Sequence, residues 1–165
     1  MNRNDFIKCW IIRTVWVFLA FFSQQLYGQQ TDTMPAINAE IVTYLKTVIG
    51  KKVDRGECWD LANEALSKTN ADWEFPTKFG KEIDPIKEQI FPGDLIQFTK
   101  VKAKNDANET WYFPVHTAIV YEVLAPGVLK IAQQNVGGKR KVQIDTLSLK
   151  DIISGKIQIY RPIRK

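Results

Sequence analysis

The first half of the chain carries two stripes of apolar residues at three- and four-residue steps, which is the spacing of one face of a helix. The first stripe begins after Pro35, a residue favoured at the start of a helix, and stops before Gly50, which can adopt a left-handed cap. The second stripe predicts a helix over residues 58–68. The apolar positions of the two stripes are Ile37, Ile41, Leu45, Val48 and Ile49, and then Cys58, Leu61, Ala62, Ala65 and Leu66.

The second half of the chain is divided into short β-branched or alternating segments by turn residues such as Pro92-Gly93-Asp94. Residues 69–91, which are interrupted by prolines and a glycine, predict no long element. The predicted strands are residues 95–99, 116–123, 128–135, 141–144 and 157–160, with a loop over 100–110 and a helical turn over 147–153. Two helices followed by about five antiparallel strands indicate the α+β class, with the N-terminal helices packed on one side of the sheet.

The first 28 residues have the three zones of a secretory signal peptide. A polar start is followed by an apolar run over residues 14–22, and a short polar stretch ends at Gly28, where we place the cleavage. The apolar run is too short to span a bilayer, which needs about 20 apolar residues. The sequence therefore predicts a signal peptide over 1–28, one domain over 29–165 and a secreted or periplasmic protein with no membrane span after cleavage. An uncleaved anchor is the alternative.

The net charge of +5 is mild, and no basic helix or aromatic-interleaved basic run suggests nucleic acid as a partner. Residues 29–165 contain a single cysteine, Cys58, and a single histidine, His116. These two side chains fall short of the three or four ligands of a zinc site, so we predict no metal and no cofactor. The sequence leaves the oligomeric state open.

Cys58 opens a predicted helix, where the positive end of the helix dipole favours the thiolate and the backbone amide can donate to an oxyanion. His116 opens a predicted strand and can exchange a proton near neutral pH. The alternative is that Cys58 is a small buried apolar residue and His116 is structural. An exported protein without a disulfide partner rarely keeps a free thiol, which favours the catalytic interpretation.

A third side chain should orient the imidazole through its other nitrogen. The hairpin around Pro126-Gly127 brings His116 near residues 133–137, and alternate residues of a strand share a face. Gln133 and Asn135 are therefore predicted to point one way and Gln134 the other. Both amides can accept from an imidazole N–H, and we favour Asn135 as the orienting residue with Gln133 beside it.

Four motifs in order resemble those of the papain-like CHAP and NlpC-type cysteine amidases and peptidases. They are GECWDLA at 56–62, PGDLIQF at 92–98, HTAIV at 116–120 and QQN at 133–135. The first is most similar to a cysteine-proteinase-fold module of some fungal actin-patch and bacterial exported proteins. The resemblance implies a papain-like fold, Cys58 as nucleophile, His116 as base, and attack on an amide bond, often in peptidoglycan peptides for bacterial members. CHAP proteins commonly have a glutamate at the position of Gln133, and a neutral amide gives an imidazolium no charge stabilisation.

These observations predict an exported cysteine hydrolase that cleaves an amide bond in a peptide or peptidoglycan-like substrate. Cys58 attacks, His116 transfers the proton, and Asn135, with Gln133, orients the imidazole. Two alternatives stay open. One is a binding module of the same fold that has lost turnover, and the other is an acyl or peptide transferase that uses the same thiol.

Overall fold

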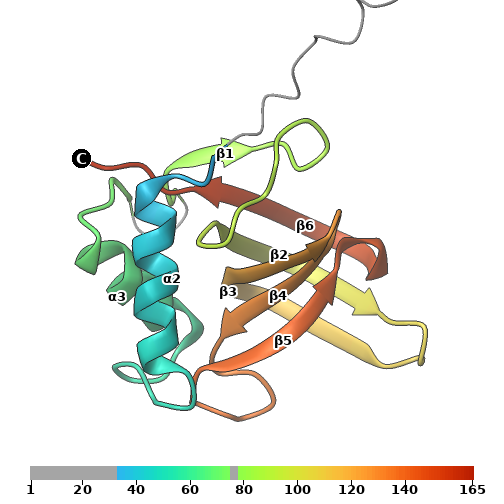
Figure 1. The fold of residues 1–165 in the computed structure, drawn as a ribbon. Helices are drawn as coiled ribbons and strands as arrows, with labels where there is room; N and C mark the ends of the chain where they lie inside the picture. The colour runs from blue at the N-terminus through green and yellow to red at the C-terminus, as the bar shows by residue number, and fades with distance from the viewer. Residues whose placement is uncertain (1–32, 75–77) are drawn as a thin grey trace, which may run out of the picture. The chain divides into compact units, whose positions relative to one another are not determined.

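The computed structural model of the chain describes residues 33–74 and 78–165. The predicted signal peptide over 1–28, including Cys9, lies outside these residues. Neither helix of the described ranges has the length and apolar character that crossing a membrane requires. The described domain consists of two helices and one six-stranded sheet (Figure 1).

The two predicted helices are confirmed. Helix α2 covers Ala36–Val48 and follows Pro35, and helix α3 covers Cys58–Lys68, the range that the apolar stripe predicted. Both helices lie on one side of the sheet (Figure 1), so the α+β arrangement with helices on one face is confirmed as well.

The sheet is antiparallel throughout and has the strand order β1-β6-β2-β3-β4-β5. Strand β6 therefore lies between β1 and β2, although it comes last in the chain. The strands are β1 (Lys81–Ile83), β2 (Leu95–Lys104), β3 (Thr110–Ala125), β4 (Val128–Gln133), β5 (Gln143–Ser148) and β6 (Ile152–Arg161), with a 3-10 turn at Leu149–Asp151.

The sheet differs from the predicted one in several places. The predicted helical turn over 147–153 is helical only at 149–151, and its other residues belong to β5 and β6. Strand β1 was not predicted, because its three residues lie in a segment interrupted by proline and glycine and are held by pairing with β6. Strands β2 and β3 extend as a ribbon through residues 100–104 and 110–115, most of which the sequence analysis assigned to a loop. Val101 and Ala103 are buried there between exposed lysines, so a strand-like alternation accompanies the backbone pairing in this lysine-rich segment.

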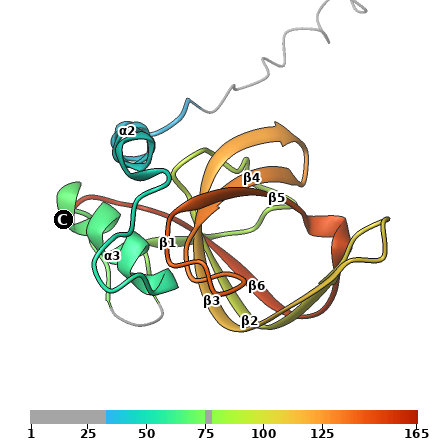
Figure 2. The same cartoon turned by 90° about the horizontal axis from the view of Figure 1, so that it is seen from below.

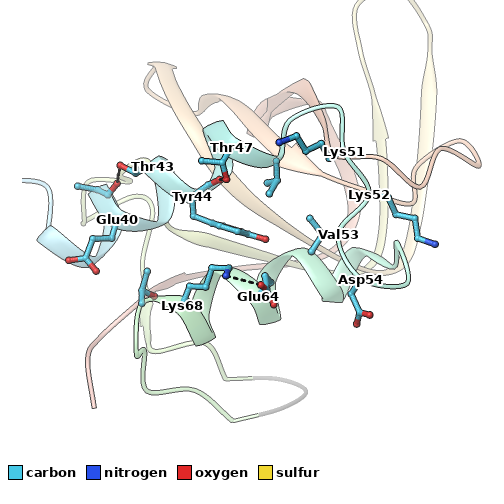
Figure 3. A pocket seen from close by; sticks show the side chains of 13 residues that line it. Glu40, Thr43, Tyr44, Thr47, Lys51, Lys52, Val53, Asp54, Glu64 and Lys68 are labelled. Atoms are coloured by element: carbon cyan, nitrogen blue, oxygen red, sulfur yellow. Dashed lines mark hydrogen bonds and ion pairs between the residues drawn. The ribbon is translucent and has the colours of Figure 1, made fainter.

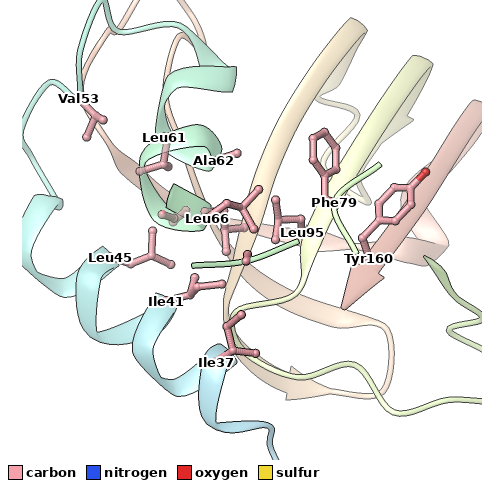
Figure 4. Packing of buried hydrophobic residues seen from close by; sticks show 14 of the residues in the cluster. Ile37, Ile41, Leu45, Val53, Leu61, Ala62, Leu66, Phe79, Leu95 and Tyr160 are labelled. Atoms are coloured by element: carbon pink, nitrogen blue, oxygen red, sulfur yellow. The ribbon is translucent and has the colours of Figure 1, made fainter. Parts of the chain in front are cut away.

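Two hydrophobic clusters occupy the two faces of the sheet. On one face Ile41 and Leu45 of α2 and Leu61 and Leu66 of α3 pack toward Leu95 of β2 (Figure 4). The other face carries a cluster built from all six strands and the segment before β2, and no helix residue belongs to it. Its members are nonetheless buried. The sheet, which is strongly curved (Figure 2), must therefore enclose them itself, and we call this inner side the concave face.

The turn before β2 is fixed by close packing against α2. Gly93 has φ +88, and a Cβ at this position would lie 2.6 Å from the carbonyl oxygen of Asn38. The next residue, Asp94, is fully buried; it accepts from Asn38 Nδ2 at 2.8 Å and pairs with Arg161 Nη2 at 3.0 Å. These contacts join the first helix, the turn and the last strand. They set the position of the sheet relative to the helices.

Candidate functional site

The thiol of Cys58 is half-buried at the first position of α3. Asp60, which is almost completely buried, accepts from the backbone N–H of Glu57 at 2.9 Å and from Arg55 Nη2 at 2.5 Å. Side chains that accept from free N–H groups at a helix start stabilise that end of the helix. The start of α3, and with it Cys58, is therefore held in one backbone conformation.

Gln134 fastens the segment before Cys58 to the end of β4. Its side-chain amide, which is completely buried, donates to the carbonyl oxygens of Glu57 at 2.6 Å and Val53 at 3.1 Å and accepts from Val53 N–H at 3.3 Å. Gln134 thus points toward the helices while Gln133 points the other way, which confirms the predicted alternation of these two residues. This role of Gln134 was not predicted from the sequence.

Asn135 does not contact the imidazole. Its side-chain amide donates to Glu57 Oε2 at 2.6 Å, and Arg140 pairs with the other oxygen of the same carboxylate at 3.1 Å. The favoured role of Asn135 as the partner of His116 is therefore not what the structure shows. The reason is local: β4 ends at Gln133, and Asn135 has φ +63, so strand alternation no longer sets its direction.

His116 lies on β3 and is only 4% exposed. Its Nε2 atom is 2.8 Å from Gln133 Oε1, so Gln133 is the amide that contacts the imidazole. The ring of Phe113 stacks on it with centroids 5.0 Å apart, and Phe98 packs at 5.7 Å. Burial lowers the pKa of His116, and the hydrogen bond with Gln133 opposes this only in part. The imidazole is therefore neutral at pH 7.

Asp145 of β5 fixes the orientation of Gln133. The side-chain amides of Gln133 and Gln143 both donate to Asp145 Oδ2, each at 2.8 Å. A carboxylate can only accept, so Gln133 must direct its NH₂ group to Asp145 and its carbonyl oxygen to His116. Nε2 of the neutral imidazole is then the protonated nitrogen, and Nδ1 carries the free lone pair.

Nδ1 of His116 has no hydrogen-bond partner among the described residues. Asn38 Oδ1 is nevertheless the sole buried side-chain polar atom without a partner in that part of the chain. Nδ1 is therefore not completely enclosed, and as the unprotonated nitrogen it can accept a proton. The sequence analysis missed Asp145 because its role depends on the β4–β5 pairing; the alternation of Gln143 and Asp145 was the available signal.

The four predicted site residues form two groups. His116 and Gln133 are joined by a hydrogen bond, and Asn135 contacts Glu57, the residue before Cys58. His116 is paired with Phe98 and shares its face, the concave one, whereas α3 packs on the opposite face. Within the described residues, the Cys58 thiol makes no hydrogen bond with the other three. The two groups adjoin at the end of β4, through residues 133–135.

A separate hollow of about 1100 Å³ lies between α2 and α3 and contains none of these four residues (Figure 3). Tyr44 lies across it, and Lys68 and Glu64 form an ion pair at its edge. Burial and the nearby Glu64 carboxylate raise the pKa of Tyr44 to about 12. In the ranges that the structure describes, no group of three or more histidine, cysteine or acidic side chains is arranged to hold a metal ion.

Comparison with known proteins identifies relatives of the domain. The family model of the AIM3/BBC1 cysteine proteinase-fold domain matches residues 29–165. Altered inheritance of mitochondria protein 3 of the fungus Debaryomyces hansenii is 26% identical over 144 residues, which cover 74% of this chain and 15% of that protein. The chain thus corresponds to a small part of that relative.

Two solved structures are similar at a TM-score of 0.48 each. The crystal structure of Ly7917 with the hydrolyzing product of MDP is 17% identical, and the match covers 78% of this chain and 63% of that chain. The crystal structure of Ly7917 is 16% identical, with 76% and 62% covered.

The Debaryomyces relative contradicts the predicted secreted or periplasmic location. Its name refers to the inheritance of mitochondria, which are organelles inside the cell. The prediction depended on the apolar run at 14–22, and a run of this length is also compatible with a buried or interfacial segment, so it does not specify export. The family match, in contrast, agrees with the resemblance carried by the four motifs. The chain belongs to the AIM3/BBC1 cysteine proteinase-fold domain family, and the predicted papain-like fold is confirmed.

Proposed function

We propose that the domain is a cysteine hydrolase that cleaves an amide bond. The observation that carries the proposal is the chain of contacts from Asp145 through Gln133 to His116, which leaves Nδ1 of a neutral imidazole as a proton acceptor. A neutral base with a defined lone pair is what a cysteine nucleophile requires. Gln133 orients the imidazole in this proposal, and Asn135 secures Glu57 beside the nucleophile.

In the proposed reaction, His116 takes the proton of Cys58 and the thiolate attacks the carbonyl carbon of the amide. The backbone N–H of Cys58, at the start of α3, donates to the oxyanion that develops. The imidazolium then protonates the leaving amine, and water releases the acyl group from the sulfur. Peptides are the proposed substrates, and the peptidoglycan peptides that the resemblance implies for bacterial members are one class to be tested.

The arrangement of the sheet sets a geometric requirement. His116 faces the concave side while α3 packs on the other, so the thiol must approach Nδ1 past the end of β4. Asn135 and Glu57 meet at that point, and Gln134 ties the same two segments together. A substrate amide would bind at this junction, where the end of the sheet and the start of the helix adjoin.

Alkylation of Cys58 by iodoacetamide at pH 7 tests the catalytic pair. The full chain is compared with His116→Ala, and Cys58→Ser measures the background from Cys9. We expect alkylation of Cys58 to be at least about tenfold slower in His116→Ala, because the proton acceptor is gone. Equal rates would show that the imidazole does not act on the thiol.

Turnover is tested separately with a peptide library that includes peptidoglycan fragments, with products identified by mass. Wild-type protein should release products with new termini, and Cys58→Ser should release none. Product that forms equally in Cys58→Ser would exclude a thiol mechanism.

A second candidate is a binding module of the same fold without turnover. The absence of a hydrogen bond between Cys58 and His116 in the described residues favours it, as does the deep burial of the imidazole. Such a module should bind its ligand equally well as wild type and as Cys58→Ser, and wild-type protein should leave the ligand intact.

A further inference from the structure

A pocket of about 660 Å³ opens on the concave face beside the imidazole. Its walls come from β2, β3, β4 and β5, and two of the residues that contact His116, Gln133 and Phe113, line it. This volume falls within the range of small-ligand pockets. A ligand in this pocket would therefore lie one side chain away from the imidazole.

The pocket combines an aromatic wall with carboxylates. Trp111 lines it and is 37% exposed, and Phe113 continues the same wall. The acidic side chains Glu109, Asp145 and Asp151 also line it, against a single lysine, Lys139. The excess of negative charge here stands out because the whole chain has a net charge of +5.

The carboxylates retain free acceptor capacity. Asp145 uses Oδ2 for Gln133 and Gln143, and no described residue bonds its Oδ1. Glu109 accepts from Asn105 through Oε2, which leaves Oε1. Asp151 forms no hydrogen bond or ion pair in the described part of the chain. A cation entering the pocket would meet carboxylate oxygens with free acceptor capacity and the aromatic side chain of Trp111, both of which can favour positive charge.

We infer that this pocket binds the side chain of a lysine or arginine residue in a peptide. An apolar stem fits against the ring of Trp111, and the charged head reaches the carboxylates. This inference rests on the proposed function in one respect, since it names cationic peptides as the substrate class of the hydrolase. Binding itself does not depend on turnover.

The experiment measures binding of short acetylated peptide amides to full-length Cys58→Ala by calorimetry, so that no product forms. The peptides are identical except for one central residue, which is lysine, arginine, norleucine or acetyl-lysine. We expect the lysine and arginine peptides to bind at least tenfold more tightly than the two neutral ones. In this background, Asp151→Asn and Trp111→Leu should each lower the affinity for the lysine peptide several-fold.

The matched control is Asp106→Asn, which removes one carboxylate from an exposed loop position outside the pocket. It should leave the affinity unchanged. Equal affinity for lysine and norleucine peptides, no binding of any peptide, or an equal effect of Asp106→Asn and Asp151→Asn would overturn the inference. Selective binding without turnover by wild type would keep the pocket and reject the hydrolase. Turnover without a preference for cationic residues would support the hydrolase and reject the cation pocket.

Discussion

Replacing Asp145 by asparagine should convert the imidazole of His116 from one neutral tautomer to a mixture of both. In the wild type the carboxylate accepts from Gln133, and this directs the carbonyl oxygen of Gln133 to Nε2 of the imidazole. An asparagine at 145 is nearly isosteric, but it can turn its NH₂ group toward Gln133. Gln133 can then reverse its own amide and donate to an unprotonated Nε2, which places the proton on Nδ1.

The free-energy difference between the two orientations of the Gln133 amide equals the hydrogen bond to Asp145 that the reversed orientation lacks in the wild type. A hydrogen bond to a charged group contributes about 1.5–3 kcal/mol. Since Asp145 is partly exposed, we use the lower value. It corresponds to roughly a tenfold preference for the orientation in which Gln133 donates to Asp145. The Nδ1–H tautomer should therefore make up less than about 10% of the neutral wild-type imidazole. In Asp145→Asn the two orientations become comparable, and this tautomer should rise toward about half.

The assay is nitrogen NMR of the imidazole ring at a pH where it is neutral. The chain contains one histidine, so labelled histidine gives the signals of His116 alone. The ring nitrogen shifts report which nitrogen carries the proton. Asp106→Asn, which removes an exposed carboxylate that pairs with Lys150, is the control and should match the wild type.

Two outcomes would refute the reasoning. One is a wild-type imidazole protonated on Nδ1, which would mean that Gln133 is not oriented by Asp145. The other is an Asp145→Asn imidazole that keeps the wild-type tautomer ratio. Loss of activity in this variant with an unchanged ratio would assign Asp145 a role other than positioning Gln133.

The remaining predictions concern stability. Because burial lowers the pKa of His116 below its ordinary 6.5, the unfolded chain binds the proton more readily, and the free energy of unfolding should fall as the pH drops below about 6.5, by up to about 1.4 kcal/mol per pH unit. Denaturant titrations between pH 5 and 7 should show this dependence of the free energy of unfolding on pH in wild type and its loss in His116→Gln. The same dependence in both proteins would contradict the prediction. Gly93→Ala should lower the free energy of unfolding by more than about 2 kcal/mol, since a positive φ and the Asn38 carbonyl both oppose a Cβ, whereas Gly137→Ala, with open space around it, should cost about 1 kcal/mol. Equal losses in the two glycine variants would show that the contact with Asn38 does not matter.

The helices and most of the sheet could be predicted because local patterns specify them. The stripe that starts at Cys58 gave the range of α3, since helix period and burial agree there. Strand β1 could not be found, because its three residues become a strand only through pairing with β6. In the ribbon at the far end of β2 and β3, the alternation of Val101 and Ala103 with lysines was a local signal that the loop assignment overlooked.

The site was predictable to the extent that strand alternation holds. Gln133 and Gln134 take opposite faces as expected, and Gln133 reaches His116. Asn135 departs from the expectation because its left-handed backbone ends the strand. Asp145 was missed because its part in the site requires the β4–β5 register, and the alternation of Gln143 and Asp145 indicates only that these two residues share a face.

The position of β6 has a consequence for how the protein is made. Until residues 152–161 have left the ribosome, β2 lacks the neighbour that covers one of its edges, and β1 has no partner at all. Exposed strand edges pair readily with other chains. Incomplete nascent chains and proteolytic fragments that end before β6 should therefore aggregate. The yield of native protein then depends on the pairing of β6 with β1 and β2.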